Sequence, residues 1–153
     1  MKHSYFGFDE SRAGVTVWLD SGLSGLKDHL AEAGYAVSVL PSELKKKGAI
    51  KCLINNQCKI FLTRGGEGFE YSLLRKCLVI LIKSREDDLT VARRVMLKLT
   101  PKLMRLLENW PFVSYAMVCA ERESVFKQAK QLTEKRKRHE GRACGPRKNR
   151  RKL

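Results

Sequence analysis

The sequence lacks any apolar stretch of the roughly 18 consecutive residues needed to cross a bilayer. Its first residues, MKHSYFGFDESRAG, also lack the apolar core of a secretory signal peptide. These absences exclude the usual sequence patterns of a membrane-spanning or signal-bearing chain. We therefore expect an intracellular protein with no membrane partner, located in the cytoplasm or, in a eukaryote, also in the nucleus.

Cysteine patterns that would indicate a disulfide framework or a zinc site are also missing. The five cysteines form no CxxC pair, and none of the three histidines lies near a cysteine at the spacing of zinc ligands. Four of the cysteines fall within apolar segments. We expect reduced thiols that are mostly buried.

Acidic residues are few, since 16 Asp and Glu stand against 31 Lys and Arg, and the formal net charge is +15. Residues 127–153 alone carry +10, and the rest of the chain carries +5. An excess of this size favours a polyanionic partner, either a nucleic acid or an anionic membrane surface. The tail lacks the bulky apolar residues of a membrane-binding helix, so we expect RNA or a ribonucleoprotein. Two clusters supply most of the charge of this tail: Lys135, Arg136, Lys137 and Arg138, then Arg147, Lys148, Arg150, Arg151 and Lys152.

The tail has almost no apolar content, so we expect it to be disordered when alone. Each Lys or Arg that neutralises a phosphate would make RNA binding depend on salt. A basic terminal run can instead be a solvated segment or a targeting address, and the sequence leaves this alternative open. Because the tail has no aromatic residue, RNA bases could stack only on aromatic residues of the rest of the chain, such as Tyr35, Phe69 or Tyr71.

Between the ends, strand patterns alternate with helix patterns. Runs rich in β-branched residues, or continuously apolar, predict strands at 15–19, 35–40, 59–63, 77–82 and 113–119. Amphipathic or polar helical patterns lie at 22–33, at 42–57 with an interruption at Gly48, at 87–109 with a kink or break at Pro101, and from about 120. This order predicts an α/β fold, a Rossmann-like three-layer sandwich around a mostly parallel sheet of about five strands. We expect a leader at 1–13, one domain at 14–126 and the tail at 127–153.

Ligands of such sheets bind beyond the carboxyl ends of the strands. Asp20, Glu43, Glu67 and Glu70 all follow predicted strands, so they could face one edge. Converging carboxylates can hold the divalent ion that generates hydroxide for phosphodiester hydrolysis. An aspartate just before Ser21 and a helix is equally a good N-cap, which stabilises a helix by about 1 kcal/mol. Both interpretations of Asp20 stay open.

The turn RGGEGFE after the third strand also has two interpretations. Its glycines would let backbone N–H groups approach a phosphate, and Arg64 would add a positive charge there. The spacing does not match a P-loop, which needs a Lys and a Ser or Thr after the last glycine. The alternative is a flexible turn.

Three segments together resemble the PIN and PIN-like ribonuclease superfamily: VTVWLDSGLSGLKDHLAEAGYAVSVL, then IKCLINNQCKIFLTRGGEGF, then CLVILI. The branch that they resemble comprises short stand-alone proteins found among toxin-like genes. Its members have a strand carrying Asp, a helix ending in GH or GY, and later a hydrophobic strand followed by T-R-D-x-D-F. The resemblance covers residues 15–120 and implies an endoribonuclease that depends on Mg²⁺ or Mn²⁺.

By this resemblance, Asp20 corresponds to the first metal-binding aspartate of the family. Thr63 and Arg64 correspond to its T-R, and Phe69 to its phenylalanine. Glu67 is the one acid inside a turn that is one residue longer than the family's.

The chain departs from the family pattern at the other acids. Gly65 and Gly68 stand where the turn's two aspartates would fall. The acid expected at the start of the second helix falls near Lys46, Lys47 and Gly48, and only Glu43, a few residues earlier, could replace it. Glycines beside Arg64 make the turn more attractive to RNA phosphates and less able to hold Mg²⁺.

Three functional hypotheses follow. The first is a PIN-like domain with a degenerate nuclease site that binds RNA, or a ribonucleoprotein, through Arg64 and the tail. The second is an active nuclease with Asp20, Glu43 and Glu67 as catalytic residues and Asp20, Glu67 and Glu70 as ligands of Mg²⁺ or Mn²⁺. The third is an interaction protein that forms a homodimer and uses its tail as an address.

Overall fold

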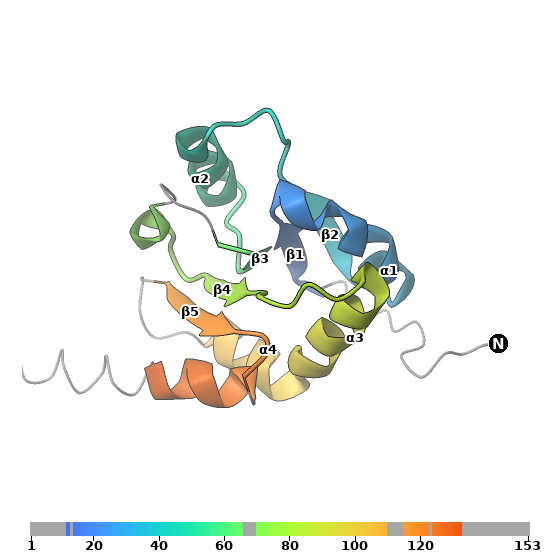
Figure 1. Ribbon diagram of the computed structural model, residues 1–153. Helices are drawn as coiled ribbons and strands as arrows, with labels where there is room; N and C mark the ends of the chain where they lie inside the picture. The colour runs from blue at the N-terminus through green and yellow to red at the C-terminus, as the bar shows by residue number, and fades with distance from the viewer. Residues whose placement is uncertain (1–11, 13, 66–69, 110–114, 123, 133–153) are drawn as a thin grey trace, which may run out of the picture.

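Five parallel strands form one central sheet in the order β2-β1-β3-β4-β5 (Figure 1). The computed structural model describes residues 12, 14–65, 70–109, 115–122 and 124–132. Helices flank the sheet on both sides, which confirms the expected α/β three-layer sandwich. The strands are β1 (Thr16–Leu19), β2 (Ala36–Val39), β3 (Ile60–Thr63), β4 (Leu78–Leu81) and β5 (Ala116–Cys119).

The burial of the strands explains their sequence patterns. All four residues of β3 are buried, as are the first three of β4, because these central strands are covered on both faces. The edge strand β2 is only half-buried along its length. The continuous apolar run CLVILI therefore has the composition that a central parallel strand requires.

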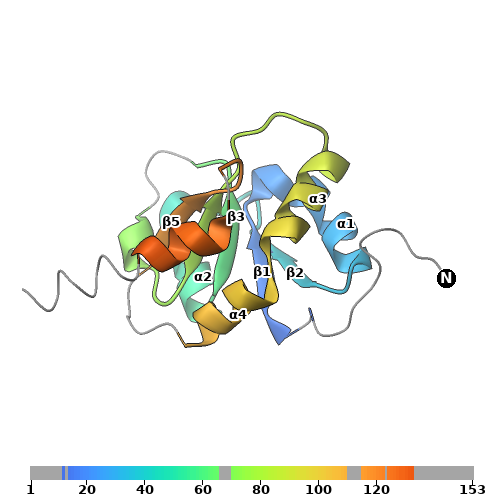
Figure 2. The same cartoon turned by 90° about the horizontal axis from the view of Figure 1, so that it is seen from below.

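The two faces of the sheet are covered unequally (Figures 1 and 2). On one face pack η2 (Ser21–Leu26), α1 (Lys27–Glu32), α3 (Asp88–Lys98), α4 (Pro101–Glu108) and the helix at 125–132. On the other face, the described residues supply only α2 (Lys46–Asn55) and η3 (Tyr71–Leu73). None of the helices in these described ranges is both long and apolar enough to cross a membrane.

The break expected at Pro101 is confirmed. Helix α3 ends at Lys98 and α4 begins at Pro101, where the missing N–H of proline costs nothing because first-turn N–H groups have no partner within the helix. The Thr100 hydroxyl caps α4 by accepting the Leu103 N–H at 3.2 Å.

The helix expected at 42–57 is shorter than predicted, and the interruption expected at Gly48 is wrong. Helix α2 begins at Lys46 and passes through Gly48 without a break. Glycine costs a helix about 1 kcal/mol relative to alanine. Full burial of Leu53 and near-full burial of Ile50 against the sheet offset that cost.

The helix expected at 22–33 begins as a 3-10 helix, η2, and becomes α-helical only at Lys27. Leu23 has non-helical dihedrals, with φ −112° and ψ 16°. The first turns contain two glycines, which disfavour regular α-helix. One of them, Gly25, closely approaches the start of α3, since a Cβ built there would lie 2.0 Å from the Asp88 Oδ2.

The cysteines within the described residues are all free thiols. Cys58 and Cys77 are buried with their sulfurs 3.8 Å apart, whereas Cys52 and Cys119 are half-buried. Burial raises the pKa of the Cys58 thiol, and the neighbouring Cys77 adds to the shift. Such a thiol stays protonated and unreactive at neutral pH.

Helix α2 ends in a Schellman motif that lacks its usual glycine. The Cys58 N–H donates to the Leu53 carbonyl and the Gln57 N–H to the Ile54 carbonyl, each at 3.0 Å. Gln57 therefore adopts a left-handed backbone conformation, with φ +52°. A side chain in this conformation costs roughly 1–2 kcal/mol, which glycine avoids.

We expect Gln57→Gly to raise the free energy of unfolding by about 1 kcal/mol, because it removes this strain. Urea denaturation followed by circular dichroism measures the change. Gln57→Ala is the matched control, because it removes the same side chain but keeps a Cβ, and it should leave stability nearly unchanged. If Gln57→Gly were no more stable than Gln57→Ala, the left-handed backbone of Gln57 would not be strained.

Candidate functional site

The order of the strands reverses direction next to β1, because β2 lies on one side of it and β3 on the other. In doubly wound sheets the connections diverge at such a point, which leaves a crevice beyond the carboxyl ends of the two strands. Asp20 follows β1 and Thr63 ends β3, and the Asp20 N–H donates to the Leu62 carbonyl at 2.9 Å. The sheet therefore places these two residues side by side at its switch point.

Hydrogen bonds hold the Asp20 carboxylate in place on both oxygens. Oδ1 accepts the Ser21 N–H at 2.8 Å, and Oδ2 accepts the Thr63 hydroxyl at 2.8 Å. The fully buried Thr63 Oγ1 in turn accepts the Gly65 N–H at 3.0 Å. Gly65 has φ +87°, a conformation that glycine adopts at little cost. Asp20 is thus the N-cap of η2, which confirms the capping interpretation.

Tyr71 of η3 lies near this pair. Burial raises the pKa of its hydroxyl, the Thr63 hydroxyl opposes that shift through a hydrogen bond, and the Asp20 charge adds to it. Its ring stacks on Tyr115, with centroids 6.4 Å apart and an interplanar angle of 26°. The sequence indicated Tyr71 only as a surface for bases. The structure instead places it near Asp20, since η3 packs on the face of the sheet that α2 covers.

Two of the other predicted carboxylates stand apart from Asp20. Glu43 and Glu70 are exposed, and neither side chain forms a hydrogen bond or ion pair with another described residue. No three His, Cys, Asp or Glu side chains within the described residues come together as a metal site. Glu67 is among residues 66–69, which lie outside the described residues.

Mg²⁺ and Mn²⁺ take about six oxygen ligands, usually including more than one carboxylate. The described part of this edge offers the Asp20 carboxylate, whose oxygens each already accept a hydrogen bond. This donor set does not by itself fit a divalent ion, so no catalytic step follows from it. The site built from all four carboxylates stays a prediction that depends on Glu67.

Arg64 is half-buried and links two loops at the same edge. Its Nη1 donates a hydrogen bond to the Ser84 carbonyl, which joins the turn after β3 to the loop after β4. The guanidinium is therefore held at the carboxyl edge, where it retains further N–H donors for a ligand. Its predicted contact with RNA phosphates stays a prediction.

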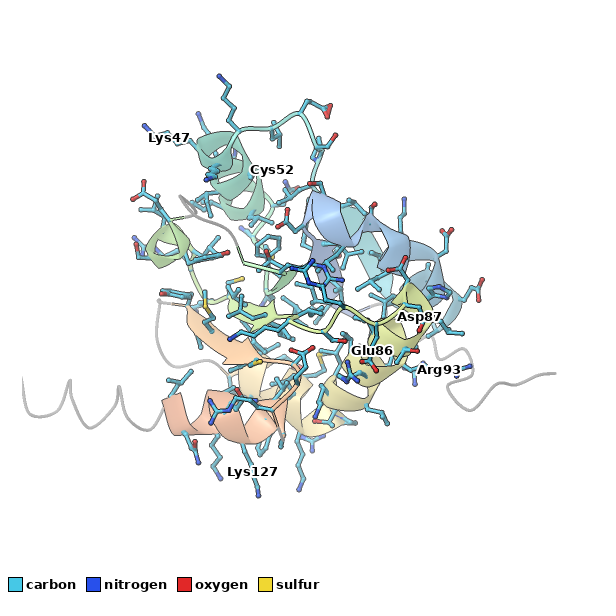
Figure 3. The ribbon with its side chains drawn as sticks, in the orientation of Figure 1. Lys47, Cys52, Glu86, Asp87, Arg93 and Lys127 are labelled. Carbon is cyan, nitrogen blue, oxygen red and sulfur yellow. The ribbon has the colours of Figure 1, made fainter. Side chains whose placement is uncertain are left out.

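The sequence analysis missed Glu121, although the strand-end rule also selects it, because it follows β5 by two residues. Its Oε1 accepts the Lys83 N–H at 2.8 Å, and its Oε2 lies 3.9 Å from Arg94, which also pairs with Glu86. Partial burial acts to raise the pKa of Glu121, but the N–H groups of Lys83 and Ser84 outweigh it, so the pKa lies below its ordinary value. Glu86, which is labelled in Figure 3, lies just before α3. Glu121 therefore joins the ends of β4 and β5.

The predicted aromatic surfaces for bases are less available than expected. Tyr35 is only 5% exposed, and the Arg12 guanidinium lies 5.3 Å from its ring centroid. Tyr71 is half-buried against the hydrophobic core between the sheet and α2. Phe69 lies outside the described residues.

Residues 127–132 of the predicted basic tail (127–153) belong to the helix at 125–132, in which Ala129 is fully buried. Residues 133–153, which hold both basic clusters, lie outside the described residues. Within them, four exposed lysines gather on and just before α2, here called the α2 lysine cluster: Lys45, Lys46, Lys47 and Lys51. None of the four pairs with a carboxylate of another described residue, and Figure 3 shows Lys47 pointing away from the sheet. The first turn of α2 has no acidic residue and no side-chain cap.

Comparisons of the chain with protein-family models, with curated proteins and with solved structures give no significant match. They neither support nor contradict the resemblance to PIN-like ribonucleases. The function is therefore argued from the chemistry of the chain itself.

Proposed function

We propose that this protein binds RNA, free or within a ribonucleoprotein, through basic side chains carried by an α/β domain. The observation that carries this proposal is the net charge of +15. In the described residues, part of this charge stands on the α2 lysine cluster, which has no carboxylate partners there. Unpaired, exposed cations gain most from a polyanion, because each phosphate contact releases counterions.

The position of these lysines is unfavourable for the helix that carries them. The N-terminal end of a helix has a partial positive charge, so basic residues there destabilise it and acidic residues stabilise it. Lys45, Lys46 and Lys47 occupy the N-cap and the first two positions of α2. A phosphate at this end would offset the repulsion and accept the N–H groups of the first turn. The arrangement therefore supports an anionic partner.

A second candidate function is the metal-dependent ribonuclease. One observation favours it: Asp20 stands at the switch point, where a sheet of this order binds its ligands. The hydrogen bonds to both oxygens of Asp20 favour a structural role instead. Binding is therefore the function that we propose first, and Asp20 is the residue that distinguishes the two.

Replacing Lys45, Lys46 and Lys47 together with glutamine should have opposite effects on binding and on folding. We expect weaker binding of single-stranded RNA and a salt dependence whose slope, log K against log salt, falls by about two, because up to three phosphate contacts are lost. We also expect the free energy of unfolding to rise by about 0.3–1 kcal/mol per charge at low salt. Fluorescence anisotropy at several salt concentrations and urea denaturation measure the two effects.

The matched control is Lys27, Lys102 and Arg105 replaced together with glutamine. These residues lie on α1 and α4, across the sheet from α2, and the control removes the same charge. It should reduce RNA affinity less than the α2 variant. Equal losses would mean that RNA responds to net charge alone, and the absence of any RNA binding by the unaltered chain would refute the proposal.

Asp20→Asn separates the binding protein from the nuclease. We expect RNA affinity to stay within about twofold, because Asp20 is used inside the fold, and stability to fall by about 1 kcal/mol, because the charged acceptor for Ser21 and Thr63 is lost. Denaturing gels of labelled RNA incubated with Mg²⁺ or Mn²⁺ report cleavage. Cleavage by the unaltered chain that is absent with Asp20→Asn would establish the nuclease in place of a binding-only role.

A further inference from the structure

One row of side chains crosses the sheet on the face that α2 covers. The strand register places Ser38, Trp18, Phe61, Val79 and Met117 side by side, one from each strand. Phe61 and Val79, on β3 and β4, are 0% exposed, in the core that α2 and η3 cover. Trp18 is only half-buried beside them, because its neighbour on β2 is the small Ser38 and α1 packs on the opposite face.

A cavity of about 260 Å³, here called the Trp18 cavity, opens at this corner, which the described helices leave uncovered. Its walls come from three places: β1, β2, and the connection from α2 to β3. The side chains that matter for binding are Thr16, Trp18, Ser38, Asn56, Gln57 and Lys59. The connection precedes β3, so the cavity lies toward the amino ends of the strands, away from Asp20.

The polar groups of the cavity offer both hydrogen-bond donors and acceptors. The Asn56 Nδ2 donates to the Cys52 carbonyl at 2.8 Å, which leaves its Oδ1 as an acceptor. The Gln57 and Ser38 side chains form no hydrogen bond with other described residues. Lys59 is exposed and adds one cation. An aromatic ring, neutral amides and a single cation together match a nucleotide, which has a flat base, a polar edge and one phosphate.

We propose that the Trp18 cavity binds one base of single-stranded RNA, stacked on the Trp18 indole, with the Asn56 and Gln57 amides on its edge and Lys59 on the adjoining phosphate. This inference rests on the proposed function and names its base-contacting site. With a volume of about 260 Å³, the cavity has room for one base. Gln57 adds an argument, because its left-handed backbone costs energy that glycine would avoid, and glycine would supply no amide.

Tryptophan fluorescence tests the stacking directly. The chain has two tryptophans, so in Trp110→Phe the emission comes from Trp18 alone. We expect single-stranded oligouridylate or oligoadenylate to quench this emission, with the same midpoint as the anisotropy titration, because a base stacks on the ring. A sugar–phosphate oligomer without bases should bind more weakly and leave the emission unchanged.

Single-residue variants of the 153-residue chain identify the contact. Gln57→Ala should weaken oligonucleotide binding about threefold to tenfold, as loss of one hydrogen bond to a base predicts. Asn55→Ala is its matched control, since it removes an exposed amide two residues away that does not line the cavity. Trp18→Phe keeps an aromatic ring, so its affinity for the oligonucleotide should be at least that of Gln57→Ala. Trp18→Leu has no ring for the base to stack on, so its affinity should fall about tenfold or more.

The outcomes separate the cavity from the proposed function. Oligonucleotide binding with unchanged Trp18 emission, and with equal affinity for Gln57→Ala and Asn55→Ala, would overturn the cavity and leave RNA binding by the lysines standing. No oligonucleotide binding in any assay would overturn both. Quenching that saturates together with binding, and that Gln57→Ala weakens, would support both.

Discussion

A parallel sheet must be covered on both faces, and this requirement determines most of the structure. Its central strands are apolar on both sides. In this protein η2, α1, α3, α4 and the helix at 125–132 pack on one face. Of the helices that the structure describes, only α2 and η3 pack on the other face. That inequality leaves the region of β2 and Trp18 partly open. The features that suggest ligand binding, the α2 lysine cluster and the Trp18 cavity, both belong to the thinly covered side.

The carboxyl edge of the sheet illustrates how a position typical of active sites can serve the fold. The Asp20 carboxylate accepts a hydrogen bond from the Thr63 hydroxyl and so links the ends of β1 and β3. The Glu121 carboxylate accepts the Lys83 N–H, just beyond the end of β4. Each carboxylate satisfies N–H or O–H groups that the ends of parallel strands leave unpaired. A carboxylate after a strand is therefore weak evidence for chemistry until its partners are known, because the same position favours both uses.

The alternation of strands and helices could be predicted from the sequence, since a continuous run such as CLVILI suits a strand buried on both faces and Pro101 must interrupt a helix. The cap at Asp20 was also within reach, from the Ser21 and helix that follow it. Gly48 misled the prediction because helix propensity is weaker than the burial of Ile50 and Leu53. The order of the strands, and with it the place of Trp18 beside Ser38, depends on pairings between distant segments that local patterns do not encode.

The strand order also bears on how the chain folds. Val17 in β1 pairs with Ile60 in β3, and Thr16 with Ala36, so no neighbouring strands join through a short hairpin. Each strand pairing requires a long loop to close, and the entropy lost in closing it is offset only after the strands have paired. Folding is therefore slower than in proteins rich in local contacts. During synthesis β1 and β2 emerge first, so the edge of β1 that later pairs with β3 stays unpaired until β3 has been made. Strand β1, which is paired on both sides in the finished sheet, is thus an exposed edge in the nascent chain, where unpaired backbone groups favour aggregation.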